Sequence, residues 1–320
     1  MSESTEIPAR RAADSQRDRA SDRERILRLL FTAILVFSLG ALGWWFWQHF
    51  TTGGMVRDGG PNWLPDSQHL IFQSEIDGQA DLFVSTLTGA DRQPAQTGAG
   101  DQIGAAYTQD GTAIAFASDR EGNFDIYKML GNFSTAVPLT RDPGRDMAPA
   151  WSPDGSFIVF MSNRSNPEFD LFKMNADGTG VEQLTSGGGN GFPQVSPDGT
   201  SVAYHHGRDV HILNLKTGQI RRVTYEPANG MHPTWSPDGR HLAFMTWRNG
   251  RTEIFTSNAD GSDPELLVQR PSGDAVDPRW SPDGASIAFV QVTGGPEASA
   301  QERVIFVVDV KSKRLNRVSR

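Results

Sequence analysis

One short phrase, built around a proline–aspartate turn, recurs six times along the chain. Its copies are NWLPDSQHLIF from Asn62, AYTQDGTAIAF from Ala106, AWSPDGSFIVF from Ala150, QVSPDGTSVAY from Gln194, TWSPDGRHLAF from Thr234 and RWSPDGASIAF from Arg279. The turn aspartates are separated by 44, 44, 44, 40 and 45 residues. Repeats of about 40–45 residues with this content are typical of β-propellers. The spacing predicts an all-β fold: a six-bladed β-propeller of four-stranded antiparallel blades.

The residues of each copy suit two hairpins. In Ser-Pro-Asp-Gly the proline fixes one backbone angle, the aspartate accepts backbone hydrogen bonds and the glycine takes a positive φ. The run that follows alternates like a buried strand, as in Ile158 to Phe160. A polar loop, a third strand, a second turn such as Asn175 to Gly178 and a short fourth strand complete the unit. The aromatic residue before most turns is expected to pack as a wedge between neighbouring blades.

Composition excludes several classes of protein. The 33 glycines and 19 prolines fit a chain of short strands and turns. No cysteine is present, so disulfides and thiolate metal sites are excluded. The formal charge of −8 argues against nucleic acid as a partner. The sequence has no G-x-S-x-G, P-loop, HExxH or EF-hand motif, so neither a cofactor nor an enzymatic activity is expected.

The N-terminal region differs from the repeats. Residues 1–28 are polar and Arg-rich and are expected to form a disordered cytoplasmic tail. Residues 29–50, LLFTAILVFSLGALGWWFWQHF, are long and apolar enough to span a bilayer as a helix. Arginines before this segment predict a single-pass signal anchor in the cytoplasmic membrane, with the N-terminus inside. A cleaved signal peptide is the alternative. Residues 51–60 are the expected linker, and residues 61–320 are the propeller, placed in the periplasm or outside the cell.

The repeat resembles a known family. The pattern P-x-W-S-P-D-G, then I-A-F-x-S-D-R-x-G-N, D-I-Y-x-M-N-A-D-G and L-T is similar to that of TolB-like six-bladed β-propellers, a WD40-like (PD40) repeat family. The resemblance implies a role like that of TolB, a periplasmic protein of the Tol–Pal system that binds partner proteins. Similar repeats occur in oligogalacturonate lyases and prolyl-oligopeptidase-type peptidases, so it implies fold more strongly than function. The α/β domain that precedes the TolB propeller has no counterpart here.

Two functions follow as hypotheses. The first is a non-enzymatic, membrane-anchored scaffold, expected to be a monomer, that binds an envelope protein or a glycan. The alternative is a polysaccharide-active enzyme, similar to oligogalacturonate lyase, that uses a His-rich rim on blades four to six. Pull-down of a stable partner would favour the first, and turnover of acidic oligosaccharides the second.

The candidate partner or ligand surface lies where the repeats diverge. The loops between strands two and three and between blades vary, and alternation places both sets on one face, where binding residues are expected. Unusual residues there are Phe192, His205, His206, His232, Trp247, Arg248 and Asp277. Their imidazoles and carboxylate leave open a divalent metal site. The acidic column Asp81, Asp125, Asp170 and Glu253 is expected to be structural, and Arg120 and Arg164 are expected to brace their loops.

Overall fold

The computed structural model describes residues 58–76, 78–225, 229–248, 250–268, 273–294 and 301–318. All of them belong to one compact unit, Gly54–Arg320. The tail expected at 1–28 and the membrane helix expected at 29–50 lie outside these ranges, so both stay predictions. A search of the described residues finds no helix with the length and apolar character to cross a bilayer.

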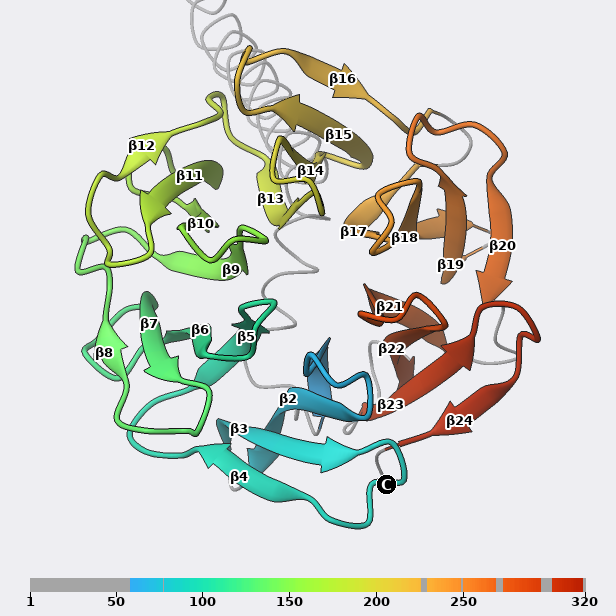
Figure 1. The fold of residues 1–320 in the computed structure, drawn as a ribbon, viewed down its shortest axis with the longest axis horizontal. Helices are drawn as coiled ribbons and strands as arrows, with labels where there is room; N and C mark the ends of the chain where they lie inside the picture. The colour runs from blue at the N-terminus through green and yellow to red at the C-terminus, as the bar shows by residue number, and fades with distance from the viewer. Residues whose placement is uncertain are drawn as a thin grey trace, which may run out of the picture. The chain divides into compact units, whose positions relative to one another are not determined.

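The described residues form six four-stranded antiparallel sheets, as predicted (Figure 1). Blade one contains β1 (Asp58–Trp63), β2 (His69–Ile76), β3 (Gln79–Thr86) and β4 (Gln93–Gln96). Blade two contains β5 (Gln102–Tyr107), β6 (Ala113–Ser118), β7 (Asp125–Leu130) and β8 (Val137–Pro138). Blade three contains β9 (Asp146–Trp151), β10 (Phe157–Ser162), β11 (Asp170–Asn175) and β12 (Glu182–Gln183).

The second half of the ring repeats this plan. Blade four contains β13 (Asn190–Val195), β14 (Ser201–His206), β15 (Asp209–Asn214) and β16 (Ile220–Arg222). Blade five contains β17 (Met231–Trp235), β18 (His241–Arg248), β19 (Arg251–Asn258) and β20 (Glu265–Val268). Blade six contains β21 (Asp274–Trp280), β22 (Ser286–Thr293), β23 (Glu302–Asp309) and β24 (Leu315–Arg317). The first strand of each blade is innermost (Figure 1).

The ring closes without exchange of a strand among the described residues, because each sheet contains consecutive strands only. Blade six instead packs against blade one, where β21, β22 and β23 contact β1. Side chains hydrogen-bond across this junction: Trp63 Nε1 donates to Arg279 O (2.9 Å), Asn316 Nδ2 donates to Leu87 O (3.0 Å) and Ser67 Oγ accepts from Asp283 N (3.1 Å). The first blade also starts earlier than expected, since β1 begins at Asp58, inside the range assigned to the linker.

The repeated turn works as the sequence suggested. In blade three, Ser152 Oγ donates to Asp154 Oδ1 (2.7 Å), Phe157 N donates to Ser152 Oγ (3.0 Å) and Gly155 N donates to Ser152 O (3.0 Å). The hydrogen bond from Ser152 Oγ, together with those from the side chain and the backbone N–H of Ser156, lowers the pKa of Asp154 to about 2. The glycine has φ +69°, and in blade one Ser67 takes its place at φ +56°. The side chain of the aspartate therefore closes each first hairpin.

The aromatic residue before the turn joins neighbouring blades, as predicted. Trp151 Nε1 donates to Ala106 O (3.2 Å) of blade two, and Trp235 Nε1 donates to Gln194 O (3.2 Å) of blade four. Trp280 is different, because its Nε1 donates to Gly284 O (3.3 Å) within its own turn. Within four of the blades, aromatic residues of the second and third strands stack on one another: Phe72 on Phe83, Phe116 on Tyr127, Phe160 on Phe172 and Phe289 on Phe306.

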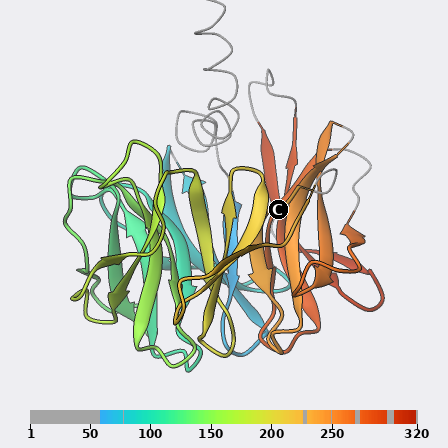
Figure 2. The same cartoon turned by 90° about the horizontal axis from the view of Figure 1, so that it is seen from above.

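The disc has two unlike faces. We call the side with the first-to-second and third-to-fourth strand connections the turn face, and the side with the other connections the irregular face. On the turn face four turn prolines lie near the next turn glycine: Pro65 near Gly111, Pro153 near Gly199, Pro197 near Gly239 and Pro237 near Gly284. On the irregular face the blades differ in height, because the second and third strands have six residues in blades two to four and eight in blades five, six and one. Figure 2 shows the taller orange and red hairpins of blades five and six.

Candidate binding site on the innermost strands

The innermost strands share one unusual backbone position. Each contains a residue with positive φ, six positions before the turn aspartate: Gly60, Gly104, Ala148, Phe192, His232 and Asp277, with φ between 48° and 63°. A β-bulge lies at this point in every blade, since the register with the second strand shifts there. A bulge redirects the side chain of the residue it contains. The six positions therefore form a ring around the central axis.

The ring is divided by residue type. Blades one and two have glycine, which adopts positive φ at low cost. Blade three has alanine, which has a minimal side chain. Blades four to six have Phe192, His232 and Asp277 in the same conformation, which costs a side-chain residue about 1–3 kcal/mol. Strain of this kind clusters at functional sites. Three neighbouring blades thus retain bulky or charged residues where the backbone favours glycine.

Three aromatic side chains stack together in blades four and five. The Phe192 ring stacks on the His232 ring, with centroids 3.6 Å apart and planes at 20°. The His205 ring, on β14, lies 5.6 Å from that of His232 at 11° and 5.5 Å from that of Phe192. These three residues come from two blades, so the stack bridges blades four and five. The structure therefore brings together Phe192, His205 and His232.

Asp277 joins the cluster from blade six. Its Oδ1 lies 2.5 Å from His232 Nδ1, and both side chains are buried. Burial opposes the charge of the carboxylate, but His232, Arg279 and Arg303 outweigh it, so the pKa of Asp277 is lowered. An ionised Asp277 accepts a hydrogen bond from His232 Nδ1, which fixes the orientation of that ring. The pair therefore holds the His232 ring in one orientation.

His205 is neutral at neutral pH. Burial lowers the pKa of His205 to about 3, and His232 and His206 lower it further. Its Nδ1 is buried and has no hydrogen-bond partner among the described residues. A buried polar atom without a partner costs free energy. Within the cluster, this nitrogen is a buried polar atom that the described residues leave unsatisfied.

The other candidates do not belong to this cluster. His206 contacts Asn190, with its Nδ1 3.1 Å from Asn190 Oδ1, and meets the ring of His211 edge-on. Both partners belong to blade four, so His206 packs within its own blade. Trp247 and Arg248 lie at the end of the β18–β19 hairpin, and the Arg248 guanidinium sits 5.1 Å from the Phe255 ring centroid. No contact in the described part of the chain connects these two residues to the ring stack.

The sequence placed Phe192, His232 and Asp277 just before the first strands, and this was wrong in detail. The structure places them inside β13, β17 and β21, at the bulges. Sequence reasoning also missed Arg279 and Arg303, which face Asp277. The six bulge residues all lie six positions before their turn aspartates. This constant spacing was the available signal for the ring of six, because equivalent positions in a repeat adopt the same backbone conformation.

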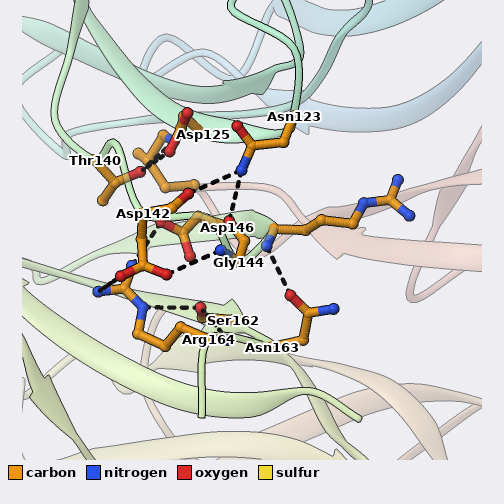
Figure 3. Close-up of polar contacts among 11 residues, drawn as sticks. Asn123, Asp125, Thr140, Asp142, Gly144, Asp146, Ser162, Asn163 and Arg164 are labelled. Atoms are coloured by element: carbon orange, nitrogen blue, oxygen red, sulfur yellow. Dashed lines mark hydrogen bonds and ion pairs between the residues drawn. The ribbon is translucent and has the colours of Figure 1, made fainter. Parts of the chain in front are cut away.

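The acidic column of the third strands is largely structural, as expected. In Figure 3, Thr140 Oγ1 donates to Asp125 Oδ1 (3.0 Å), and Arg164 Nη2 donates to Asp146 Oδ2 (2.6 Å). The Nε of Arg164 also donates to Ser162 Oγ (2.9 Å), so this arginine braces its loop. Asp170 accepts hydrogen bonds from Thr185, Gly188 and Asn190. The Asp170 contacts join blade three to blade four, and the other contacts lie within blades two and three.

Neither a metal-ligand group nor a surface depression provides a better candidate site among the described residues. Within the described ranges, no group of three or more His, Asp or Glu residues is arranged to hold a metal ion. Two depressions, of about 300 and 430 Å³, lie on the turn face. Asp154, Asp110, Asp198 and Asp238 line them, and hydrogen bonds within the turns already occupy these carboxylates. The cluster of Phe192, His205, His232 and Asp277 stays the better candidate.

Comparison with known proteins assigns the family. The family described as the TolB beta propeller domain matches residues 52–209 and 200–320, which together cover most of the chain. The chain belongs to this family. In sequence, it is 41% identical over 39 residues to the Tol-Pal system protein TolB of Hydrogenovibrio crunogenus. That stretch covers 12% of this chain and only 9% of the relative.

Solved structures show the same fold. The structure of a putative TolB from Agrobacterium tumefaciens has a TM-score of 0.61 and 24% identity, over 71% of this chain and 87% of that one. An oligogalacturonate lyase from Vibrio parahaemolyticus has a TM-score of 0.56 and 15% identity, over 84% of this chain and 78% of that one. At these identities the likeness establishes the propeller alone.

Proposed function

We propose that the chain is a non-enzymatic TolB-like scaffold that binds a protein partner in the cell envelope. In this proposal residues 29–50 hold it in the cytoplasmic membrane as a single-pass anchor with the N-terminus inside. The propeller then lies in the periplasm or outside the cell, as a monomer. Partner binding is the property that the name of the TolB relatives suggests, through their place in the Tol-Pal system.

The observation that supports a binding site is the strained half of the ring. Phe192, His232 and Asp277 adopt positive φ where the equivalent residues of the other blades are small. Two of the three are buried and hydrogen-bonded to each other, so the rings are held in place before any partner arrives. A preorganised aromatic group loses little entropy on binding. We therefore assign partner contact to Phe192, with His205, His232 and Asp277 as positioning residues.

Photo-crosslinking from position 192 tests this proposal. A photoreactive phenylalanine analogue would replace Phe192 in the full-length protein, expressed in its own membranes. A second protein carrying the analogue at Lys216, which is exposed on the turn face, is the control. We expect a discrete protein adduct from position 192 that position 216 does not give. Equal adduct patterns, or none at 192, would refute the assignment.

The same material tests the lyase-like alternative, which rests on the shared propeller fold. The purified full-length protein would be incubated with acidic oligosaccharides, and unsaturated products would be followed by ultraviolet absorbance. Turnover that depends on His205 and His232 would support an enzyme and refute the scaffold. Absence of turnover together with a protein adduct supports the scaffold.

A further inference from the structure

The chain enters the propeller on the irregular face. β1 runs from Asp58 to Trp63 and then meets the turn face, so its first residue is at the opposite side of the disc. Seven residues, 51–57, separate this strand from the apolar segment that ends at Phe50. Seven extended residues span at most about 25 Å. This step rests on the membrane anchor of the proposed function.

So short a tether limits the orientation of the disc. A strand of eight residues, which sets the thickness of the disc, is about 26 Å long. Residues 51–57, fully extended, would reach only about that far. Because β1 is innermost, a tether to the opposite side would also have to cross a ring of blades (Figure 1). The irregular face is therefore the one that the anchor keeps toward the bilayer.

The parts of that face that project furthest are the long hairpins. Strand pairing in blade two ends at Ser118 and Asp125, whereas in blade five it continues to Arg248 and Arg251. The two extra residues per strand raise the hairpin by about 7 Å. The β2–β3 hairpin of blade one is extended in the same way, to Ile76 and Gln79. Figure 2 shows the long orange hairpin of blade five beside the shorter ones of blades three and four.

The side chains at these raised ends are of the kind found at bilayer surfaces. Ile76 is 49% exposed and Trp247 is 43% exposed, although both are large and apolar. Trp247 is followed by Arg248, and Arg251 begins the next strand. Tryptophan partitions to the headgroup level of a membrane, and arginine extends its charge toward phosphate from the same depth. Among the described residues, the acidic groups near these ends include Glu75 on β2, Asp274 on β21 and Glu302 on β23, and Asp77 follows Ile76 in the sequence.

We propose that the raised hairpins of blades one and five contact the outer leaflet of the cytoplasmic membrane. Ile76 and Trp247 enter the headgroup region, and Arg248 lies beside the phosphates of anionic phospholipids. Blades two to four are shorter, so they leave space between the disc and the bilayer. A partner reaches the Phe192–His232 cluster through that space.

Spin labelling of the full-length protein in liposomes tests the contact. The chain has no cysteine, so a single nitroxide can be attached through Ile76→Cys. Liposomes of phosphatidylcholine and phosphatidylglycerol would contain the purified protein alone. We expect the label at 76 to collide more with oxygen and less with a water-soluble nickel chelate than a label at Lys216→Cys on the turn face. Water-like values at both positions would overturn the proposal.

A second variant separates Trp247 from general proximity. Trp247→Ser should make the accessibility values of the label at 76 more water-like. Liposomes of phosphatidylcholine alone, which lack the anionic lipid, should have the same effect more weakly. Leu315→Ser, an exposed apolar residue on the outer strand β24, is the matched control and should have no effect. Equal effects of the two serine variants would contradict the proposal.

The outcomes separate this contact from the rest of the proposed function. Release of the full-length protein from membranes by alkaline carbonate would refute the anchor itself. Protein that stays in the membrane but has a water-exposed label at 76 would overturn the contact alone. Shielding of the label in native membranes but not in liposomes would assign the hairpins to a protein instead of lipid, and would also overturn it.

Discussion

Blades one to three and blades four to six have the same backbone at the centre of the disc but different side chains on it. The bulged position is Gly60, Gly104 and Ala148 in the first set, and Phe192, His232 and Asp277 in the second. The first set shows what the fold requires at this position, namely a residue that tolerates positive φ. The second set departs from this requirement in three neighbouring blades. The difference separates residues retained for folding from residues that folding does not explain.

The largest effect is expected in blade three, where a buried ion pair joins the loop after β10 to the start of β9. Arg164 is 14% exposed and Asp146 is fully buried. Arg164→Ala would leave that carboxylate without its cation, and loss of one partner of a buried pair costs about 3 kcal/mol. Urea unfolding should show this loss. Lys173→Ala removes the more exposed pair with Glu182 and should cost less than about 1 kcal/mol. Similar losses for the two variants would contradict a structural role for Arg164.

In blades five and six, breaking the His232–Asp277 pair should have a smaller effect. Asp277→Ala removes the acceptor of His232 Nδ1, and a buried group left unpaired costs about 2 kcal/mol. Asp277→Gly removes the same acceptor but also relieves the positive φ, so it should be less destabilising by about 1 kcal/mol. Chemical denaturation of both variants measures the difference. Equal stabilities would mean that the backbone at residue 277 is not strained.

Exchange of side chains in the first three blades tests the strain by itself. Ala148→Gly should stabilise the protein by about 1 kcal/mol, because glycine accepts φ +50° freely. Gly104→Ala should destabilise it by a similar amount, because alanine is strained at this positive φ. The new Cβ would meet only Ala148 Cα, at 3.9 Å, which is an ordinary contact, so no steric clash adds to the effect. The two shifts in thermal midpoint should have opposite signs. A stabilising Gly104→Ala would disprove the assignment of strain.

The smallest effects are pH-dependent. Burial raises the pKa of Asp125 from 3.8 to about 6, and the charge of Asp146 adds to this. The folded protein binds this proton more tightly than the unfolded chain, so the stabilisation is complete below pH 4 and is lost as the pH rises toward 6. Asp125→Asn should remove that slope from a series of unfolding curves. An unchanged slope would show that Asp125 titrates normally.

Asp154 is the control of opposite sign. Its lowered pKa, about 2, means that its contribution is present above pH 4 and is lost as the pH falls toward 2. Asp154→Asn should therefore flatten the acid side of the stability profile and leave the region between pH 4 and 6 unchanged. A change confined to that higher region would contradict the hydrogen bonds from Ser152 and Ser156.

The fold could be predicted because its information is local and repeated. Each Ser-Pro-Asp-Gly turn contains its own hydrogen-bonding partners, and six copies at near-constant spacing determine the number of blades. The closure of the ring could not be read in this way. It depends on contacts between residues more than two hundred positions apart, such as Trp63 and Arg279.

The candidate site was predictable in its residues but not in its arrangement. Phe192, His232 and Asp277 stood out as departures from the repeat. Their positive φ, the stacking of His205 and the separation of Trp247 depend on strand register and on packing between blades. A bulge changes the direction of one side chain without a fixed residue type to mark it, so the constant spacing from the turn aspartates locates the six positions but does not reveal their conformation.

The comparison of partner recovery by Phe192→Gly and Ala148→Gly tests the central claim most directly. Both substitutions relieve a positive φ on an innermost strand, and neither removes a side chain that can hydrogen-bond. We predict that full-length protein with Ala148→Gly recovers its envelope partner from solubilised membranes as the unaltered protein does, and that Phe192→Gly loses it while remaining folded. Equal recovery by both variants would contradict the assignment of recognition to blades four to six.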